Sequence, residues 1–413
     1  MMRCSKNQTS ETPAQATTTH EVVQNSTADA CVVPTQGEAT VEQWADANNA
    51  FGFKLLAKTT GNVVLSPYSA MRALGMVYDG ACGDTASGMR KAMSLPEAVN
   101  LSQIGAEIEK NMIVKDVEEL TVNIDNRIWC EQSYALRDAY VADVKSHYGS
   151  TPESVDFVHN AEQVRLKIND LIAAATNDKI QNLLMPGTID AMTRLVLTNA
   201  VYFKGQWSDT FKPEATHKAD FRQKSGSIEV DMMRQTESYA IYTDEKVTAL
   251  DMDFNGPFAM MVLMPNVEDN ADVEAALTSL ESQMTSAKLR EIREGYHLES
   301  VSLSMPKFKQ ESTLPLTQWL ADLGMGKAMS PDADFSRMTG SLDLTISSVL
   351  QKAYIAIDEN GAEAAAATAV VMRLKSARRP ATPIEITVDH PFLYVLIERT
   401  TGTALFMGRV LKP

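Results

Sequence analysis

The chain has 413 residues, of which 44% are hydrophobic and 22% are charged, an ordinary balance for a globular protein. Its 53 Asp and Glu outnumber its 38 Lys and Arg, and the resulting net charge of −15 argues against binding to nucleic acid or to anionic membranes. Four cysteines (Cys4, Cys31, Cys82 and Cys130) are too few and too scattered to predict a disulfide framework or a zinc site, and no apolar run is long enough to predict a transmembrane helix.

Residues 1–40 contain no aromatic residue and are dominated by Thr, Ala, Gln, Ser and Glu. Such a composition buries too little apolar surface to offset chain entropy, so we predict a disordered leader or linker. No apolar segment follows the first basic residue, so the start does not resemble a signal peptide. Two interpretations of Cys4 stay open. It could begin a trimmed lipoprotein, which together with the polar leader favours an extracellular or surface-tethered protein, or it is an ordinary cysteine, and free cysteines allow an intracellular location.

Order is expected to begin near Val41. Apolar residues at Trp44, Phe51 and Leu55 follow a helical period, which predicts an amphipathic helix. In residues 62–81 a short β-branched run precedes Ser66 and Pro67, a pair typical of a helix start.

Further along the chain, residues 122–129 alternate as in a strand. Residues 193–207 form a continuous apolar run that predicts a strand buried on both faces, with a turn expected at Lys204 and Gly205. A helix is predicted over 273–284, and residues 391–413 predict two buried strands joined by a Thr-Gly turn. Helices and strands mixed without a regular βαβ period favour an α+β fold.

The sequence offers no support for an enzyme. It lacks a GxSxG elbow, an HExxH pair, a phosphate-binding loop and a GxGxxG turn, and its six histidines have no metal-ligand spacing. His390 precedes a proline and is interpreted as structural. We therefore expect no catalytic residues, no cofactor and no metal.

Residues 361–380, GAEAAAATAVVMRLKSARRP, combine a small-residue tract with a basic end. The alanines favour a helix by propensity. As a strand, however, the segment would place small or apolar residues on one face and Glu363, Arg373 and Lys375 on the other. Its basic end before Pro380 is typical of an exposed, protease-sensitive loop. This segment alone leaves two interpretations open. It could be an insertable strand followed by a protease bait, or a surface helix followed by a solvated basic loop.

Four motifs in order resemble the serpin family. They are NVVLSPYS (62–69), TNAVYFKGQW (198–207), KAYIAIDENGAEAAAATAV (352–370) and DHPFLYVLIERTTGTALFMGRVLKP (389–413). The resemblance runs from Val41 to Pro413, so it implies one serpin domain over 41–413, with three β-sheets, about eight or nine helices and an exposed reactive loop at about 359–385.

The resemblance also implies a function. A serpin is a suicide inhibitor of serine proteases: the protease attacks the loop, an acyl-enzyme forms, and the cleaved loop inserts into the central sheet. The hinge of inhibitory serpins, a glycine followed by small residues and an acid, is matched here, and no proline or charge occupies its inward-facing parity. The hinge residues are Glu359, Gly361, Ala362, Glu363, Ala364, Ala365, Ala366 and Ala367. A non-inhibitory serpin that acts as a binding or chaperone module is the alternative.

Family spacing places the residue before the cut seventeen positions from the hinge glutamate, counting both. Counting from Glu359 gives Lys375, followed by Ser376, and a Lys bait implies trypsin-like targets. The segment from Ser376 to Pro391 is somewhat long, so the register could shift. Alternative baits are Arg373, Leu374, Arg378 and Arg379, and Val370, Val371 or Leu374 would suit elastase- or subtilisin-like proteases.

Two further sets are implied by the resemblance. The shutter, under the middle of the central sheet, is formed by Ser66, Ser69, Asn199 and Gln351. The breach, where the loop enters the sheet, is formed by Trp207, Lys307 and Glu359. Gln351 stands where the family often has histidine, so the hydrogen bonds are expected to survive but not the pH response. Lys307 is expected to pair with Glu359, although a solvent-facing strand lysine is the other interpretation.

The expected partner is a target serine protease, with the protein itself a monomer. No nucleic acid is expected, and residues 97–112, near the place of a heparin-binding helix, are not basic.

Overall fold

The computed structural model describes residue 31 and residues 39–97, 101–112, 120–268, 271–362 and 382–413. These parts contain ten α-helices, two of them no more than five residues long, and fifteen strands in two hydrogen-bonded sheets. This mixture confirms the predicted α+β class. The helices are α1 (Val41–Leu56), α2 (Pro67–Tyr78), α3 (Gly83–Ala92), α4 (Leu101–Met112), α5 (Asp138–Tyr148), α6 (Phe157–Ala175), α7 (Val273–Gln283), α8 (Ser286–Glu294), α9 (Leu316–Leu320) and α10 (Ser336–Thr339).

The larger sheet has nine strands, with β1, β15, β14, β8, β7, β6, β9 and β13 in order and β5 paired to β6. The 18-residue strand β6 joins its two ends, because it pairs with β7 at one end and with β5 and β9 over the rest. Two of the three expected sheets are therefore joined through β6 into this one nine-stranded sheet. The strands are β1 (Val63–Leu65), β5 (His217–Gln223), β6 (Gly226–Thr243), β7 (Val247–Asp253), β8 (Phe258–Pro265), β9 (His297–Pro306), β13 (Ile384–Thr387), β14 (Phe392–Glu398) and β15 (Ala404–Val410).

The second sheet is the central sheet of the molecule, with β10, β11, β12, β4, β2 and β3 in order. Its strands β11 and β4 also pair directly and in parallel, while β12 lies between them only at one end. Its members are β2 (Thr121–Glu131), β3 (Glu153–Val155), β4 (Leu195–Gln206), β10 (Phe308–Pro315), β11 (Ser348–Asp358) and β12 (Gly361–Ala362).

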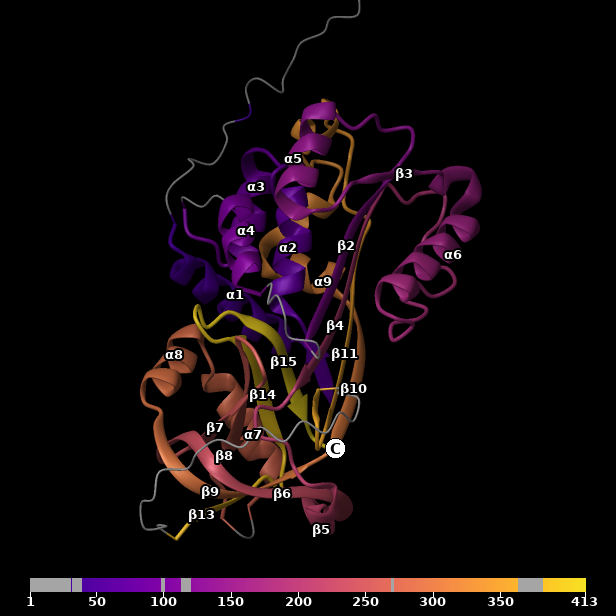
Figure 1. The fold of residues 1–413 in the computed structure, drawn as a ribbon. Coiled ribbons are helices and arrows are strands. Elements are labelled where there is room, and N and C mark those ends of the chain that lie inside the picture. Colours follow the sequence, from indigo (N-terminus) through magenta and orange to yellow (C-terminus); the bar gives the residue numbers. More distant parts are fainter. Residues whose placement is uncertain (1–30, 32–38, 98–100, 113–119, 269–270, 363–381) are drawn as a thin grey trace, which may run out of the picture.

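The central sheet is covered on both faces. Helices α1–α5 lie on one side and α6 on the other, as Figure 1 shows. The first side belongs to a large core shared with the nine-stranded sheet, and the second is a smaller core around α6 that includes Trp129 and Ile168. The continuous apolar run of β4 is explained by this double burial.

Local sequence signals fix the start of the first two helices, of which α2 contacts β4 and β2 of the central sheet. Ser66 caps α2, since its hydroxyl accepts from the backbone N–H of Ser69 at 3.2 Å, and Pro67 occupies the first helical position. The first helix begins at a capping box in which Thr40 and Gln43 bond reciprocally.

The turn expected at Lys204 and Gly205 was wrong. Strand β4 continues to Gln206, and Gly205 is needed there for packing, since a Cβ atom would approach the ring of Phe203 to 2.8 Å.

The sequence did not predict a disulfide, but Cys31 and Cys82 form one. This bond ties one residue of the predicted leader to the start of α3.

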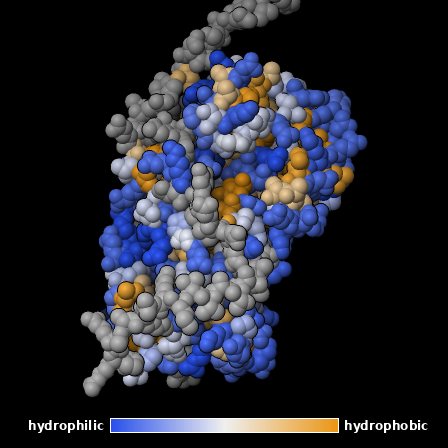
Figure 2. Space-filling view, viewed as in Figure 1, coloured by the Kyte–Doolittle hydropathy of each residue, from blue (hydrophilic) through white to orange (hydrophobic). Residues whose placement is uncertain are grey.

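The face in Figure 2 is mostly hydrophilic, and the apolar side chains that it exposes form small, scattered groups. In the described ranges, no helix has both the length and the apolar character needed to cross a bilayer.

Candidate functional site

A two-residue strand marks one end of the central sheet. Gly361 and Ala362 (β12) pair with Gln206 and Gly205 of β4, and on their other side with Asp358 and Ile357 of β11. Both pairings are antiparallel. Below this point β11 and β4 pair with each other directly, from Ser348 opposite Val196 to Tyr354 opposite Tyr202. The chain that leaves β11 therefore turns back at once and begins to separate β11 from β4.

The turn before β12 is held by the segment that follows β4. The backbone N–H of Trp207 donates to the carbonyl of Asn360 at 2.8 Å, and that of Phe211 donates to the carbonyl of Glu359 at 2.9 Å. The indole Nε1–H of Trp207 donates to the carbonyl of Asp358 at 3.0 Å. The Trp207 ring is buried and stacks on Phe254 with centroids 4.2 Å apart. Trp207 thus fixes where the loop starts.

Gly361 is required by this geometry. Its φ of +143° lies where L side chains are strained, and a Cβ atom would stand 2.1 Å from the carbonyl oxygen of Gly205. A side chain at this position would therefore push β12 out of the gap between β4 and β11.

The carboxylate of Glu359 is anchored beside the turn. It accepts from Nζ of Lys307 at 2.9 Å and from the hydroxyl of Thr216 at 2.6 Å. Glu359 is only 8% exposed. Burial alone would raise its pKa, but the hydrogen bonds from Thr216 and Lys307 outweigh that effect and hold the pKa of Glu359 below its ordinary value. The structure thus brings together all three breach residues predicted from the sequence.

The shutter is a row of polar side chains in the middle of the sheet. Asn126 of β2, Asn199 of β4 and Gln351 of β11 are direct cross-strand neighbours. The amide of Gln351 donates to Oδ1 of Asn199 at 2.6 Å, and the amide of Asn199 donates in turn to Oδ1 of Asn126. This row bridges the two strands, β4 and β11, that β12 begins to separate.

Helix α2 contacts this row of side chains through hydrogen bonds from Ser66 and Ser69. Gln351 bonds both backbone groups of Ser66, accepting from its N–H at 2.9 Å and donating to its carbonyl at 2.8 Å. The hydroxyl of Ser69 accepts from Asn199 and donates to Oδ1 of Asn126 at 3.1 Å. Ser66, Ser69, Asn199 and Gln351 are all at most 1% exposed. The helix is therefore attached to β11 through Ser66 and to β4 and β2 through Ser69.

Two residues of these clusters were missed by sequence reasoning. Asn126 completes the shutter row, and Thr216 is the second donor to Glu359. Neither lies in one of the four motifs. Only the strand register, which places Asn126 opposite Asn199, reveals the first, and only tertiary packing reveals the second.

Several predicted site residues lie outside the described ranges. They are the hinge residues Glu363, Ala364, Ala365, Ala366 and Ala367, the bond Lys375–Ser376, and the other bait residues Val370, Val371, Arg373, Leu374, Arg378 and Arg379.

His390, interpreted from the sequence as structural, is buried, and its ring nitrogens contact Asp389 at 2.7 Å and the carbonyl of Pro265 at 2.9 Å. Within the described ranges, His, Cys, Asp and Glu form no group of three or more that could hold a metal ion.

A sheet whose two central strands are joined by a polar row and divided at one end by the entering loop matches one family of known proteins. The family model described as "Serpin (serine protease inhibitor)" matches residues 46–413. The chain therefore belongs to the serpin family, which includes protease inhibitors.

Relatives from distant organisms agree. Leukocyte elastase inhibitor A of Rattus norvegicus is 34% identical over 389 residues, covering 90% of this chain and 100% of its own. A serpin-like protein of Thermococcus kodakarensis is 32% identical over 373 residues, covering 89% of this chain and 85% of its own.

Solved structures confirm the fold. Serpin48 of the insect Tenebrio molitor has a TM-score of 0.78 at 29% identity, and human thyroxine-binding globulin complexed with thyroxine has a TM-score of 0.79 at 27% identity. Each match covers 91% of this chain and 100% of the other. The similar proteins thus include one named for an inhibited protease and one named for a bound hormone.

Proposed function

We propose that this serpin inhibits serine proteases, with trypsin-like enzymes as its first targets, by inserting its cleaved reactive loop between β4 and β11. The observation that carries the proposal is β12. Gly361 and Ala362 already pair antiparallel to both strands, as the first two residues of an inserted strand would. A loop used only as a passive connection would not need to enter the sheet.

The register of β12 supplies a residue-by-residue expectation for the inserted strand. Each step forward along the loop is one step back along both β4 and β11. Ala364 would then lie between Phe203 and Ile355, which are fully buried in the main core. Ala366 would lie between Val201 and Ala353, also in that core. Small residues at these positions would fill the sheet interior without a clash.

Continuing the same register would place Thr368 between Asn199 and Gln351. The hydrogen bond that joins these two amides would have to break when the strands part. A threonine hydroxyl both donates and accepts, so Thr368 could bond both amides and restore the row. Polar pairing would then be kept in the open sheet, which supports insertion as the function of this segment.

The free energy released by loop insertion is large enough to support trapping of the protease. A net backbone hydrogen bond contributes about 0.5–1.5 kcal/mol, so a strand of about ten residues paired on both sides contributes on the order of 10 kcal/mol. This is comparable to the stability of a typical protease domain, about 5–15 kcal/mol. Insertion of the loop with a protease still attached could therefore distort that protease.

The test is incubation with a slight excess over trypsin, followed by a denaturing gel and intact mass. We expect an SDS-stable complex and a released fragment that begins at Ser376. Lys375→Ala should remove the complex with trypsin, whereas Arg373→Ala should retain it. Complete cleavage of the wild type without any complex would contradict inhibition and favour a binding or chaperone role.

A pair of hinge variants separates insertion from simple binding. Ala364→Glu would bring a charge between Phe203 and Ile355, so we expect cleavage without trapping. Ala365→Glu would face the opposite side of the sheet, between Tyr202 and Tyr354, which are buried in the core around α6. There, Nζ of the exposed Lys309 lies 5.2 Å from the ring centroid of Tyr354 and could pair with the new carboxylate, so we expect this variant to retain more of the complex than Ala364→Glu. Equal trapping of trypsin by both variants would contradict the proposed pairing register of the inserted loop with β4 and β11.

We further propose that the protein works in an oxidising compartment, outside the cell or tethered to its surface. The Cys31–Cys82 disulfide supports this location, because such bonds persist mainly in oxidising environments. A redox state assay on the native protein from its source is the test, and two reduced thiols would contradict the location.

A further inference from the structure

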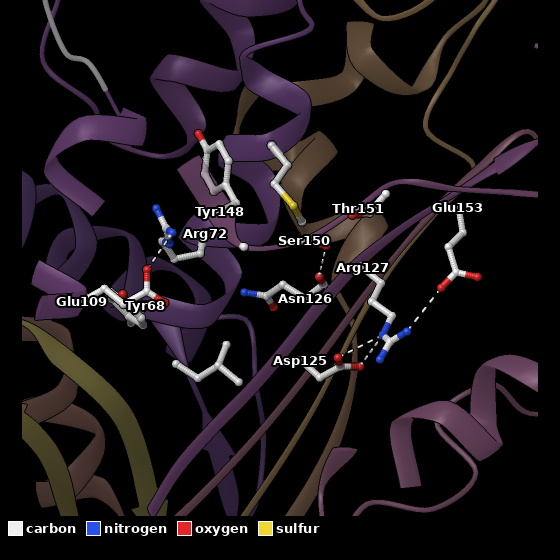
Figure 3. A pocket seen from close by; sticks show the side chains of 13 residues that line it. Tyr68, Arg72, Glu109, Asp125, Asn126, Arg127, Tyr148, Ser150, Thr151 and Glu153 are labelled. Atoms are coloured by element: carbon white, nitrogen blue, oxygen red, sulfur yellow. Dashed lines mark hydrogen bonds and ion pairs between the residues drawn. The ribbon is translucent and has the colours of Figure 1, made fainter. Parts of the chain in front are cut away.

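A cavity of about 350 Å³ lies beside the shutter row, between α2, α5 and β2 (Figure 3). Tyr68, Arg72 and Met76 of α2 form one wall, and Asn126 and Arg127 of β2 form the opposite wall. Asn126 belongs to both features, since its Oδ1 accepts from Asn199 within the shutter row while its side chain lines the cavity. A molecule in the cavity would therefore touch the shutter.

Hydrogen-bond donors without partners line this cavity. The side chain of Arg72 is 6% exposed, and its Nη2 donates to Glu109 at 3.1 Å and to the carbonyl of His147 at 2.9 Å. Its Nη1 is buried against Gly105 of α4 and finds no partner among the described residues. Within the same ranges, Nδ2 of Asn126 and the hydroxyl of Tyr68 also donate no hydrogen bond, and both side chains line the cavity. An occupant that accepts hydrogen bonds would satisfy Asn126 and Tyr68.

The charges on the walls limit what the occupant can be. Asp125 and Glu153 contact Arg127 at 2.9 Å and 3.2 Å, so these two carboxylates are already neutralised. The third carboxylate, that of the half-exposed Glu109, is paired with Arg72. A cationic ligand would therefore find no unpaired carboxylate in the walls. A phosphate dianion would be repelled by Glu109, Asp125 and Glu153 about twice as strongly as a singly charged carboxylate, because the repulsion scales with the charge of the ligand. A monocarboxylate is therefore the anion that reaches the unpartnered donors at the smaller electrostatic cost.

We propose that this cavity binds a small monocarboxylate with an apolar body, and that the bound molecule holds the central sheet closed. The carboxylate would accept from Asn126 and Tyr68, and the apolar body would contact Met76 and Ile124, which also line the walls. This role as a regulator rests on the proposed function, because it acts on loop insertion.

The coupling follows from how α2 is attached. Ser66 holds Gln351 of β11, and Ser69 holds Asn126 and Asn199 of β2 and β4. Inserting a strand moves β4 and β11 apart by about 4.8 Å, so α2 cannot keep both attachments. If β2 and β4 slide past α2, the two walls of the cavity shift. A ligand that fits only the closed arrangement therefore opposes insertion.

The binding test uses the intact protein without protease. Phenylacetate, its neutral analogue phenylacetamide and its cationic analogue phenethylamine are compared by ligand-observed NMR. We expect phenylacetate to bind best and Tyr68→Phe to weaken it about tenfold, since a hydrogen bond to a charged group is lost. The ring of Tyr68 still packs on Trp44 in this variant. Tyr78→Phe, in the same helix but away from the cavity, should bind like the wild type.

The coupling test measures insertion of a synthetic peptide with the sequence of residues 361–374 by native gel. At ten times its dissociation constant for the wild type, phenylacetate should slow insertion about elevenfold, and the same concentration should slow insertion into Tyr68→Phe only about twofold. Absence of binding by phenylacetate, or tighter binding of phenethylamine, would overturn the site. Saturation without slower insertion would overturn the coupling. Failure of the peptide to insert even without phenylacetate would instead contradict the proposed function, while the NMR result still decides the site.

Discussion

The amide of Gln351 on β11 donates to the amide oxygen of Asn199 on β4 across 2.6 Å, and this bond joins the two strands that an inserted loop has to part. In the closed sheet both side chains are buried and fully engaged, Gln351 with the backbone of Ser66 and Asn199 with Ser69 and Asn126. The bond is therefore a barrier to opening as well as a contribution to stability.

Replacing Gln351 should weaken this barrier. Gln351→Leu would leave the N–H of Ser66 and Oδ1 of Asn199 buried and unpaired, and we expect the free energy of unfolding to fall by about 3 kcal/mol in urea titrations. Spontaneous loop insertion and polymer formation on native gels should speed up.

Gln310→Leu is the matched control. Gln310 is also buried, and it bonds the carbonyl of Arg409 and the hydroxyl of Tyr394, away from the β4–β11 pair. It should destabilise the protein without faster insertion. Equal acceleration by both variants would mean that general stability, not the shutter, controls opening.

Acid should loosen the breach through Glu359. Since its pKa is held below the ordinary value of 4.5 in the folded protein, its contribution to stability is complete above pH 4.5 and is lost as pH falls through the folded-state pKa. Polymer formation should therefore accelerate below pH 4.5. Glu359→Gln keeps the shape but not the charge, so it should polymerise faster at neutral pH and lose the part of the acid response due to this group. An unchanged acid response in that variant would assign it to other carboxyls.

Thr368 should matter only after cleavage. Thr368→Val removes the hydroxyl that would bond Asn199 and Gln351 in the inserted strand. We expect the cleaved form of this variant to melt at a lower temperature, with the uncleaved form unaffected, as measured by calorimetry before and after limited proteolysis. Thr368→Ser keeps the hydroxyl and should restore most of the loss. A cleaved Val variant as stable as the wild type would contradict the register.

Reduction should destabilise the domain through Cys31–Cys82. The bond closes a loop with a sequence separation of 51, for which chain entropy gives up to about 4 kcal/mol. Urea unfolding with and without reductant measures the difference, and Cys31→Ser should reproduce it and abolish the effect of reductant. Cys130 should not interfere, because burial, together with the neighbouring Glu131, raises the pKa of its thiol to about 12. If reductant still destabilised Cys31→Ser, the effect would not be due to the Cys31–Cys82 disulfide.

Much of the fold could be predicted because its signals are local. The Ser66–Pro67 pair starts α2, and the apolar run at 195–206 forms a doubly buried strand. The turn expected at Gly205 failed because glycine also serves close packing, and propensity alone cannot separate the two uses. The joining of two expected sheets into one through β6 depends on long-range strand pairing, which no local sequence pattern encodes.

The breach and shutter residues were predicted from the family resemblance, although Lys307 and Gln351 lie just outside the four motifs, and the structure brings them together. Asn126 and Thr216 could not be found because each acts through a partner far away in sequence. Cys31 was missed for the same reason, since its partner is fixed by the tertiary fold rather than by spacing.

The position of β12 also has a kinetic meaning. Adding a strand to a sheet is slowest at its first residues, which lose conformational freedom before many hydrogen bonds reward them. Gly361 and Ala362 are already paired with both strands in the uncleaved chain. In the proposed mechanism, insertion would then only have to extend an existing pair of residues. Its rate would be higher, relative to the rate of acyl-enzyme hydrolysis, than if these two residues still had to enter the sheet.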